Sequence, residues 1–371
     1  MKKTTMMMAV LAVAVMAGAA AKKPVKLFLE NDGSPGKVHP LTLRDHQLHP
    51  MRGFFYNESY FLIAITEQGY YGYVTFLVSN TGIESNQPGF SFTIVTPDRV
   101  RHVKDIDFRA ADLKTERDRF EFRLAGNYLR QTAEGFELKI AAEDMGMELE
   151  FKNTVPGFVL GNGRAVFGAE GDHFFYINYP CPRPVVSGSF TLKGETVPVS
   201  GWGYMDHSIF NSNPAEFQEV WYNFKFHSPT HTVLISSFTT PPVYEKNFGH
   251  AVLTDEKEVL CAFTDVRVTE EEVETDAESG KPYPARVRYE LVGEDCSVRA
   301  VMDSSQITEK FDVLAKLDQR WYGRTVKKAI HAFIAKPWYF RSVAEVEVEF
   351  TVKGETRKVT GTAFNEIIFT N

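Results

Sequence analysis

The chain has 371 residues, an ordinary globular composition and a formal net charge of −7 at pH 7. That length is long for one domain and sufficient for two. The negative balance argues against nucleic acid as a partner, because phosphate backbones are bound by clustered basic surfaces. Phe and Tyr are frequent, with 30 and 15 copies, and an aromatic-rich chain with many short apolar runs favours β-structure.

The N-terminus has the three parts of a secretory signal. Lys2 and Lys3 precede an apolar run that ends in the small residues 17–21, which match the charged, apolar and cleavage regions of a signal peptide. The run is shorter than the roughly 20 residues that span a bilayer; a retained membrane anchor is the alternative. We therefore expect residues 1–21 to be removed and the chain to be exported to a periplasm, a secretory lumen or the cell exterior.

Residues 22–49 lack a periodic pattern and are interpreted as a lead-in arm. From Phe54 onward, short β-rich runs are broken by turn residues such as Gly69 and Gly82. The expected strands of the first half are 60–66, 70–79, 90–96, 100–108, 119–124, 128–132, 136–142, 147–154, 174–177, 185–192 and 197–202. Those of the second half are 220–226, 232–239, 250–253, 258–263, 287–291, 297–302, 342–353 and 355–369.

One helix is expected, over Trp321–Ala335, where apolar residues recur at helical spacing before Pro337. Its basic residues allow two interpretations: a cover over a barrel mouth, or a contact with an anionic membrane surface. The acidic stretch Glu270–Ser279 is expected to be an exposed loop. Short strands at regular spacing predict an all-β protein built from sandwiches or barrels. We place the domain boundary near residue 215, giving domains at 50–215 and 216–371.

The densest unusual segment is Gly201–Ser208. Its glycines predict a close backbone approach or a bend. Asp206 and His207 are the candidate catalytic residues, as an acid–base couple. Neighbouring residues of a strand point to opposite faces, however, so the pair shares a cavity only if a bulge or turn intervenes. The alternative is a strand end at which Asp206 caps a turn.

Aromatic residues near the middle of the chain are the candidate ligand-binding residues. Their alternation fits strands that line either an ordinary core or an aromatic-walled pocket, and the pattern does not separate the two. Arg183 is a candidate for binding a carboxylate or lipid headgroup, unless it belongs to a plain connector. The candidates are Trp202, Tyr204, Trp221, Tyr222, Phe224, Phe238 and Arg183.

The three cysteines do not form a disulfide framework, and Cys261 with Cys296 is the candidate pair in an oxidising compartment. No Cys or His pair has the spacing of a zinc knuckle, and no nucleotide-binding or nucleophile-elbow motif is present. We expect neither metal nor nucleotide cofactor.

Several motifs, in order along the chain, resemble the survival factor 1 family. They are Trp221-Tyr222-Asn223-Phe224-Lys225-Phe226, Ser237-Phe238-Thr239-Thr240-Pro241-Pro242, Lys310-Phe311-Asp312-Val313-Leu314-Ala315, Ala335-Lys336-Pro337-Trp338-Tyr339 and Gly361-Thr362-Ala363-Phe364-Asn365-Glu366-Ile367-Ile368-Phe369. The resemblance implies two consecutive lipocalin-like antiparallel β-barrels, binding of ceramide or a related sphingolipid, and a link to survival under oxidative stress.

The family lies in a wider group with AttH-like proteins and carotenoid hydratases. Gly203-Tyr204-Met205-Asp206-His207 resembles the hydratase members, which implies Asp206 as a proton donor to an alkene. Three hypotheses therefore stand. The first is a lipid carrier, the second a hydratase, isomerase or cyclase of a polyene or terpenoid, and the third a scaffold whose barrels are filled by side chains.

Overall fold

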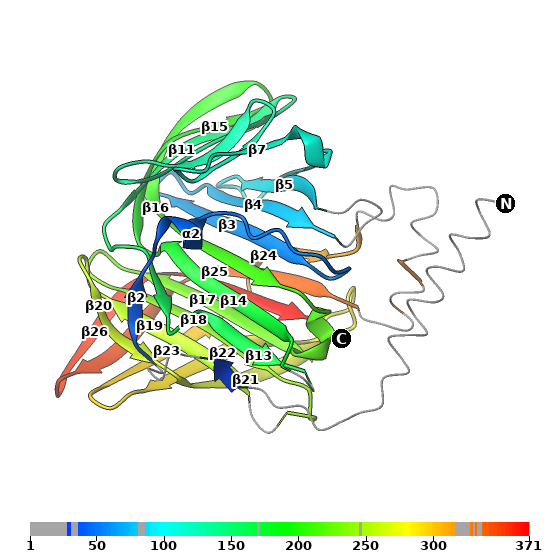
Figure 1. Cartoon of the computed structure of the whole chain (residues 1–371). Helices are drawn as coiled ribbons and strands as arrows, with labels where there is room; N and C mark the ends of the chain where they lie inside the picture. Colours follow the sequence, from blue (N-terminus) through cyan, green and yellow to red (C-terminus); the bar gives the residue numbers. More distant parts are fainter. Residues whose placement is uncertain are drawn as a thin grey trace.

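The computed structural model describes residues 28–30, 36–80, 86–168, 171–244, 247–315, 327–328, 331 and 336–370 (Figure 1). The expected signal at 1–21 lies outside these residues, and so does most of the helix expected over Trp321–Ala335. Among the described helices, none is long and apolar enough to cross a membrane.

The strands of the first half form one antiparallel sheet. Its main path runs β6-β5-β4-β3-β16-β15-β11-β10-β9-β8-β7. The strands are β1 (Phe28–Glu30), β2 (Val38–Pro40), β3 (Asn57–Thr66), β4 (Tyr71–Ser79), β5 (Gln87–Val95), β6 (Arg101–Asp107), β7 (Leu113–Thr115), β8 (Glu121–Leu124), β9 (Asn127–Gln131), β10 (Gly135–Ala142), β11 (Met145–Asn153), β12 (Phe158–Leu160), β13 (Arg164–Phe167), β14 (His173–Cys181), β15 (Pro184–Leu192) and β16 (Glu195–Phe210).

The second half forms another antiparallel sheet, with the main path β20-β19-β18-β17-β26-β25-β23-β22-β21. The strands are β17 (Val220–His227), β18 (Thr232–Thr239), β19 (Phe248–Thr254), β20 (Val259–Phe263), β21 (Asp265–Thr275), β22 (Pro282–Val292), β23 (Cys296–Asp303), β24 (Ile307–Asp312), β25 (Trp338–Val352) and β26 (Glu355–Phe369). The short helices are α2 (Leu43–His46), η1 (Ala110–Asp112) and η2 (Pro214–Glu216).

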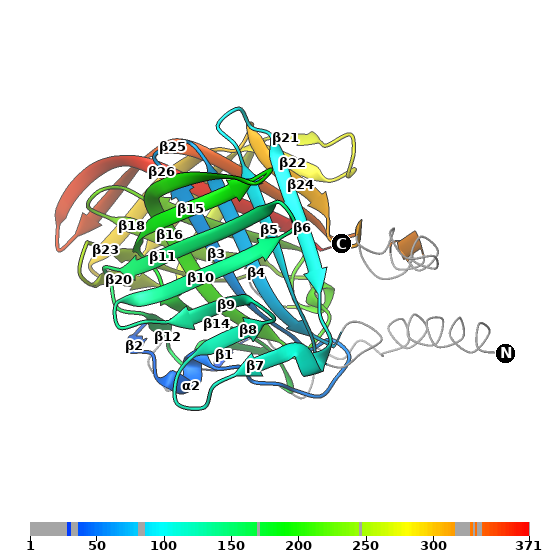
Figure 2. The ribbon, with the colours of Figure 1, turned by 90° about the horizontal axis from the view of Figure 1, so that it is seen from above.

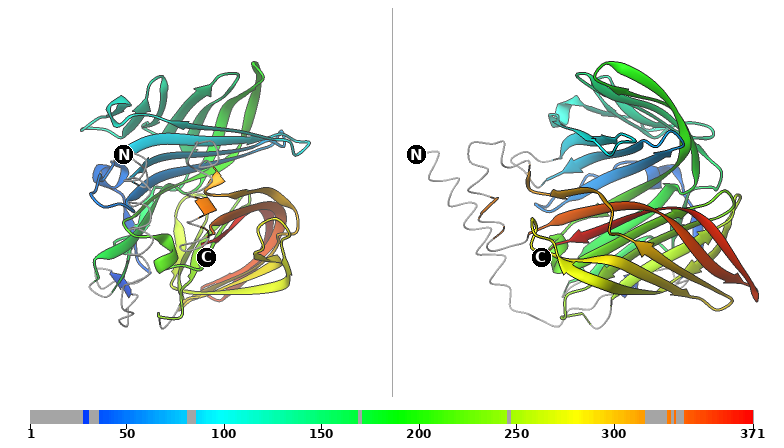
Figure 3. Two further views of the ribbon diagram at one scale, coloured as in Figure 1. Left: turned by 90° about the vertical axis from the view of Figure 1, so that its right-hand side faces the viewer. Right: turned by 180° about the vertical axis from the view of Figure 1, so that it is seen from behind.

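Each sheet curls, so that the molecule consists of two half-barrels (Figures 2 and 3). The prediction of an all-β protein with two consecutive lipocalin-like barrels is confirmed. Among the described strands, neither main path closes on itself, so each has an edge strand at either end. The first path ends at β6 and β7, the second at β20 and β21.

Two local expectations are corrected. Residues 270–275, expected in an exposed loop, belong to strand β21. Acidic residues suit an edge strand, because charge there discourages pairing with other chains, and Glu271 pairs with Arg288 of the neighbouring strand β22. Within the expected lead-in arm, β2 pairs with β12, and α2 precedes β3.

Alternation along the strands sorts side chains into three apolar layers. In β3, Tyr60 and Leu62 face the concave side of the first half-barrel, whereas Phe61 and Ile63 face a layer shared by the two sheets. In β17, Tyr222 and Phe224 face the concave side of the second half-barrel, and Trp221 faces the shared layer. The half-barrels therefore pack through the outer faces of β3, β16, β17 and β26.

Candidate functional site

Asp206 and His207 lie on opposite faces of β16, inside the strand and not at its end. Both are buried. His207 is opposite Tyr60 of β3, and the two rings stack with centroids 4.2 Å apart on the concave side of the first half-barrel. Asp206 is opposite Phe61, in the layer shared by the two sheets. Strand alternation predicts this separation, and the two residues therefore do not form one acid–base couple.

The glycines before Asp206 fit the expectation of a close backbone approach. A Cβ on Gly201 would lie 2.0 Å from the carbonyl oxygen of Ile65, and one on Gly203 would lie 2.5 Å from that of Ile63. Non-bonded carbon and oxygen atoms do not approach so closely. Both positions on β16 thus require glycine so that β3 can lie alongside.

Asp206 belongs to a buried cluster of charged side chains in the shared layer. Lys225 of β17 donates from Nζ to Glu366 Oε2 at 2.6 Å, and Arg341 of β25 donates from Nε to Glu366 Oε1 at 2.9 Å. A second nitrogen of Arg341 contacts Glu309 of β24 at 2.5 Å. Buried charges need such partners, because each unpaired ion loses several kcal/mol of hydration.

The first half contributes to the same cluster. Arg101 donates from Nε to Glu309 Oε1 at 2.6 Å, and the Thr93 hydroxyl donates to the same oxygen at 3.2 Å. Phe61 and Tyr73 lie under the Arg341 guanidinium, with both ring centroids 5.1 Å away. The cluster therefore joins the two half-barrels by ion pairs and cation–π contacts.

Within this cluster the pKa of Asp206 is unusual. Burial raises it to about 7, against the opposing effects of Lys225 and a hydrogen bond from Tyr204. Burial also lowers the pKa of Lys225, although Glu366 and Asp206 act in the other direction. A carboxyl with a pKa near 7 can hold or release a proton at neutral pH.

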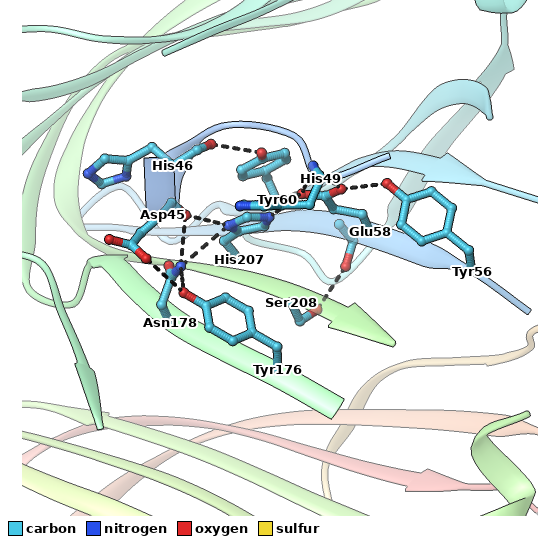
Figure 4. A network of polar contacts seen from close by, with 11 residues as sticks. Asp45, His46, His49, Tyr56, Glu58, Tyr60, Tyr176, Asn178, His207 and Ser208 are labelled. Carbon is cyan, nitrogen blue, oxygen red and sulfur yellow. Dashed lines mark hydrogen bonds and ion pairs between the residues drawn. The ribbon is translucent and has the colours of Figure 1, made fainter. Parts of the chain in front are cut away.

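On the other face of β16, His207 lies in a polar network near α2 (Figure 4). Its Nε2 lies 2.7 Å from Oε1 of Glu58, and its Nδ1 lies 2.9 Å from the Asp45 carbonyl oxygen. The backbone N–H of His49 and the hydroxyl of Tyr56 donate to the other Glu58 oxygen. Burial alone would raise the pKa of Glu58, but the hydrogen bonds from His207, His49 and Tyr56 lower it to about 2.

The second half-barrel contains a pocket of about 370 Å³ on its concave side. Tyr222 contributes its hydroxyl, which donates to Glu270 of β21. Thr269 and Glu270 are exposed, so the pocket opens to solvent beside them. The lining residues are Tyr222, Ser237, Thr239, Asn247, Val266, Val268, Thr269 and Glu270.

The pocket lies where edge strand β21 folds back over β18 and β19. Gly249 of β19 allows this close packing, since a Cβ there would lie 2.9 Å from the Cβ of Val266. Among the described residues, β21 takes its strand hydrogen bonds from β22. The line of contact between β21 and β19, called the seam below, is therefore held by side chains.

The other candidate ligand-binding residues are distributed over the molecule. Phe224 packs on Tyr289 inside the second half-barrel, with centroids 4.7 Å apart. Phe238 and Trp221 contact each other in the shared layer. Trp202 stacks on His227, with ring centroids 4.7 Å apart. Tyr204 is beside Asp206, and Tyr222 alone of the candidates lines the 370 Å³ pocket.

Arg183 binds the protein itself. It is buried and donates to Thr232 Oγ1 at 2.6 Å and to the carbonyl oxygens of Ser228 and Pro229 at 3.0 and 2.7 Å. Its guanidinium therefore fastens the β17–β18 turn to the first half. Cys261 and Cys296 are free thiols that share a hydrogen bond.

Several residues of these sites were missed in the sequence. Glu58 and Glu309 lie between polar neighbours, and Arg341 is followed by Ser342, so the local pattern does not mark these three residues. A charged residue within an apolar stretch of a strand is the signal that could have found the others. Lys225, between Phe224 and Phe226, and Glu366, before Ile367, show this signal clearly.

Relatives by sequence include fungal proteins. The chain is 25% identical over 268 residues to the ceramide-binding protein SVF1 of Yarrowia lipolytica, an alignment that covers 64% of each protein. It is 29% identical over 202 residues to the ceramide-binding protein svf1 of Aspergillus fumigatus, which covers 51% of this chain and 46% of that protein. The chain thus spans less than two thirds of the length of these relatives.

Solved structures share the fold. CghA with Sch210972 superposes with a TM-score of 0.60 at 12% identity, over 94% of this chain and 99% of CghA. Kievitone hydratase from Nectria haematococca superposes with a TM-score of 0.56 at 14% identity, over 94% and 98% of the two chains. An AttH protein from Nitrosomonas europaea superposes with a TM-score of 0.58 at 17% identity, over 84% of this chain and 92% of the AttH protein. At these identities the likeness concerns the fold alone.

The sequence profile of one family extends over nearly the whole chain, through both half-barrels and the layer between them. It matches residues 15–371, and this chain is a member of the Svf1 family.

Proposed function

We propose that this chain binds a ceramide-like lipid, whose polar head lies in the 370 Å³ pocket of the second half-barrel. The observation that carries the proposal is membership of the Svf1 family along residues 15–371. The relatives matched in Yarrowia lipolytica and Aspergillus fumigatus are named ceramide-binding proteins. The pocket supports the choice of the second half-barrel as the binding site.

The chemistry of the pocket suits an uncharged polar head. A ceramide presents an amide and hydroxyl groups, which need both donors and acceptors. Tyr222, Ser237, Thr239 and Asn247 supply neutral polar groups, and the Glu270 carboxylate accepts hydrogen bonds. The volume of about 370 Å³ falls within the range of about 300–1,000 Å³ that is usual for small-molecule sites.

The acyl and sphingoid chains need an apolar path. Val266 and Val268 of β21 form the apolar wall of the pocket and pack on the core of the second half-barrel. In the part of the chain that the structure describes, side chains hold β21 to β19 and no strand ladder joins the two, so the strands can separate without breaking strand hydrogen bonds. We infer that the lipid chains enter between these strands.

Binding is tested with the delipidated chain and a fluorescent short-chain ceramide. We expect saturable binding of one ceramide per chain and weak competition by phosphatidylcholine of the same chain length, because the Glu270 carboxylate in the pocket repels the phosphate of its zwitterionic head. Equal competition by both lipids, or the absence of saturable ceramide binding, would contradict the proposal.

Proton transfer at Asp206 is a second candidate function. The raised pKa of this buried carboxyl favours it. A hydratase would add the mass of one water to a bound polyene, and an isomerase in heavy water would replace one hydrogen of the polyene by deuterium. Incubation of the chain with polyene lipids, followed by mass spectrometry, tests both reactions. Identical products from wild-type protein and Asp206→Asn would exclude this role.

We further propose that the chain is exported. Lys2, Lys3 and the apolar run that ends at residues 17–21 support this assignment. Expression of the full chain with a C-terminal tag and N-terminal sequencing of the product test it. A mature N-terminus near Lys22 is the expected result, and a product that retains Met1 and stays in the cytoplasm would contradict it.

A further inference from the structure

Three metal-ligating side chains converge beneath α2, where the segment before β3 passes over β16 (Figure 4). His49 Nδ1 lies 3.2 Å and His207 Nε2 lies 2.7 Å from Oε1 of Glu58. The three ligand atoms lie within 4.8 Å of one another. Two imidazoles and one carboxylate form a common ligand set for first-row divalent metals. We propose that His49, Glu58 and His207 bind one divalent transition-metal ion of the Zn²⁺ type.

The orientation of His207 favours ligation. Its Nδ1 lies 2.9 Å from the Asp45 carbonyl oxygen, which accepts the Nδ1 proton when Nε2 gives up its own proton and binds a metal ion beside Glu58. Asn178 Nδ2 donates to the same carbonyl at 2.9 Å and fixes its position. A histidine whose second nitrogen donates to a backbone carbonyl is the usual arrangement at protein metal sites.

Glu58 is held in a matching way. The Tyr56 hydroxyl and the His49 backbone N–H donate to its Oε2, and its Oε1 points at the two imidazoles. Ligand atoms around a tetrahedral ion lie about 3.3 Å apart for metal–ligand bonds of about 2.0 Å. The His49–Glu58 distance of 3.2 Å already fits, and the His207–Glu58 distance must widen by about 0.6 Å from 2.7 Å to admit the ion.

Access to the site is through His49. Its side chain is 30% exposed, whereas the side chains of Glu58 and His207 are fully buried. Three protein ligands leave a fourth position for water or another small ligand. The site is not recognisable in the sequence, because its ligands come from the segment before β3, from β3 and from β16 and meet only in the folded chain.

The test uses the full chain, stripped with a chelator and titrated calorimetrically with Zn²⁺, with Co²⁺ absorption to report coordination. We expect one Zn²⁺ per chain and a tetrahedral Co²⁺ spectrum. His49→Gln, at the partly exposed ligand, should weaken binding about 100-fold, and Tyr56→Phe should weaken it about tenfold. Thermal melts of both variants establish that they are folded.

His173→Gln is the matched control. His173 Nδ1 lies 3.2 Å from Glu216 Oε2, and in the described part of the chain this pair belongs to no three-ligand group. Its substitution should leave Zn²⁺ affinity unchanged. Failure of the wild-type chain to bind Zn²⁺ stoichiometrically, or equal affinity in folded His49→Gln, would overturn the proposal.

Discussion

The two half-barrels share one architecture and differ in what fills their concave faces. In the first, phenylalanine rings contact one another across the interior. The ring centroids of Phe122 and Phe76 are 5.2 Å apart, and those of Phe120 and Phe136 are 5.9 Å apart. In the second, the Phe224–Tyr289 contact leaves space beside Tyr222, where the 370 Å³ pocket opens. The curl of a sheet creates an interior, but the size of the inward side chains determines how much of it remains for a ligand.

The comparison assigns different roles to the two interiors. The packed aromatic interior of the first half-barrel contributes stability, because the rings of Phe76, Phe120, Phe122 and Phe136 are removed from water. The polar-lined pocket of the second contributes little burial and several hydrogen-bonding groups. Substitutions should therefore separate stability from lipid binding.

The largest effect is expected for Phe122→Ala in the first half-barrel. Phe122 is fully buried, and its truncation leaves a cavity that costs about 3–5 kcal/mol in the free energy of unfolding. Urea denaturation measures the loss, and ceramide affinity of the folded variant should stay unchanged. The exposed Phe54→Ala is the control, with an effect within about 0.5 kcal/mol. A Phe122→Ala protein that folds normally but no longer binds ceramide would reverse the assignment.

The layer between the half-barrels gives the next largest effect, as a pH dependence of stability. Burial raises the pKa of Asp206 from 3.8 to about 7, so the folded state binds this proton more tightly than the unfolded chain. The resulting stabilisation is complete below pH 3.8 and is lost as the pH rises through about 7. The shift corresponds to at most about 4 kcal/mol.

Asp206→Asn removes this titration. The unfolding free energy of wild-type protein should therefore fall relative to that of Asp206→Asn between about pH 5 and about pH 8. The exposed Asp265→Asn is the control and should follow the wild-type profile. Parallel profiles for wild-type protein and Asp206→Asn would show that this carboxyl is ionised throughout.

These sites also show which features could be predicted from the sequence and which could not. Strand alternation predicted that Asp206 and His207 face different sides, because the direction of a side chain is a local property. The partners of these residues were not predictable, since Glu58 lies 149 positions before His207 and meets it only through the pairing of β3 with β16.

The aromatic candidates illustrate the same limit. The sequence correctly indicated that Trp221-Tyr222-Asn223-Phe224 lies in a strand. It did not indicate which face of that strand borders a pocket and which borders another sheet. That distinction depends on how the two sheets pack, and tertiary contacts between distant segments determine it.

At the seam of the second half-barrel, Gly249→Ala should have an intermediate effect. The added methyl group would lie 2.9 Å from the Cβ of Val266, and relief of this contact moves β21 away from β19. Overpacking of this kind costs about 1–3 kcal/mol. Hydrogen exchange should rise in β21 and stay unchanged in β10 of the first half-barrel. Unchanged exchange in β21 would mean that the seam is not a close contact.

The smallest effect is expected for Tyr222→Phe. It removes the hydroxyl that donates to Glu270 and faces the pocket. We expect ceramide binding to weaken about tenfold, or about 1.4 kcal/mol, as for one lost hydrogen bond to the uncharged head. Tyr283→Phe is the matched control, because the Tyr283 hydroxyl donates to the Ser304 carbonyl of the same half-barrel outside the pocket. Equal losses in both variants would argue against a head site at Tyr222.

The most direct test of the central claim is photo-crosslinking with a ceramide that carries a photoreactive group near its head. Protease digestion and mass spectrometry would then locate the label. We predict labelled peptides from β17, β18 and β21, within residues 220–275. Label concentrated in β3–β11 of the first half-barrel would contradict the claim that the second half-barrel holds the lipid.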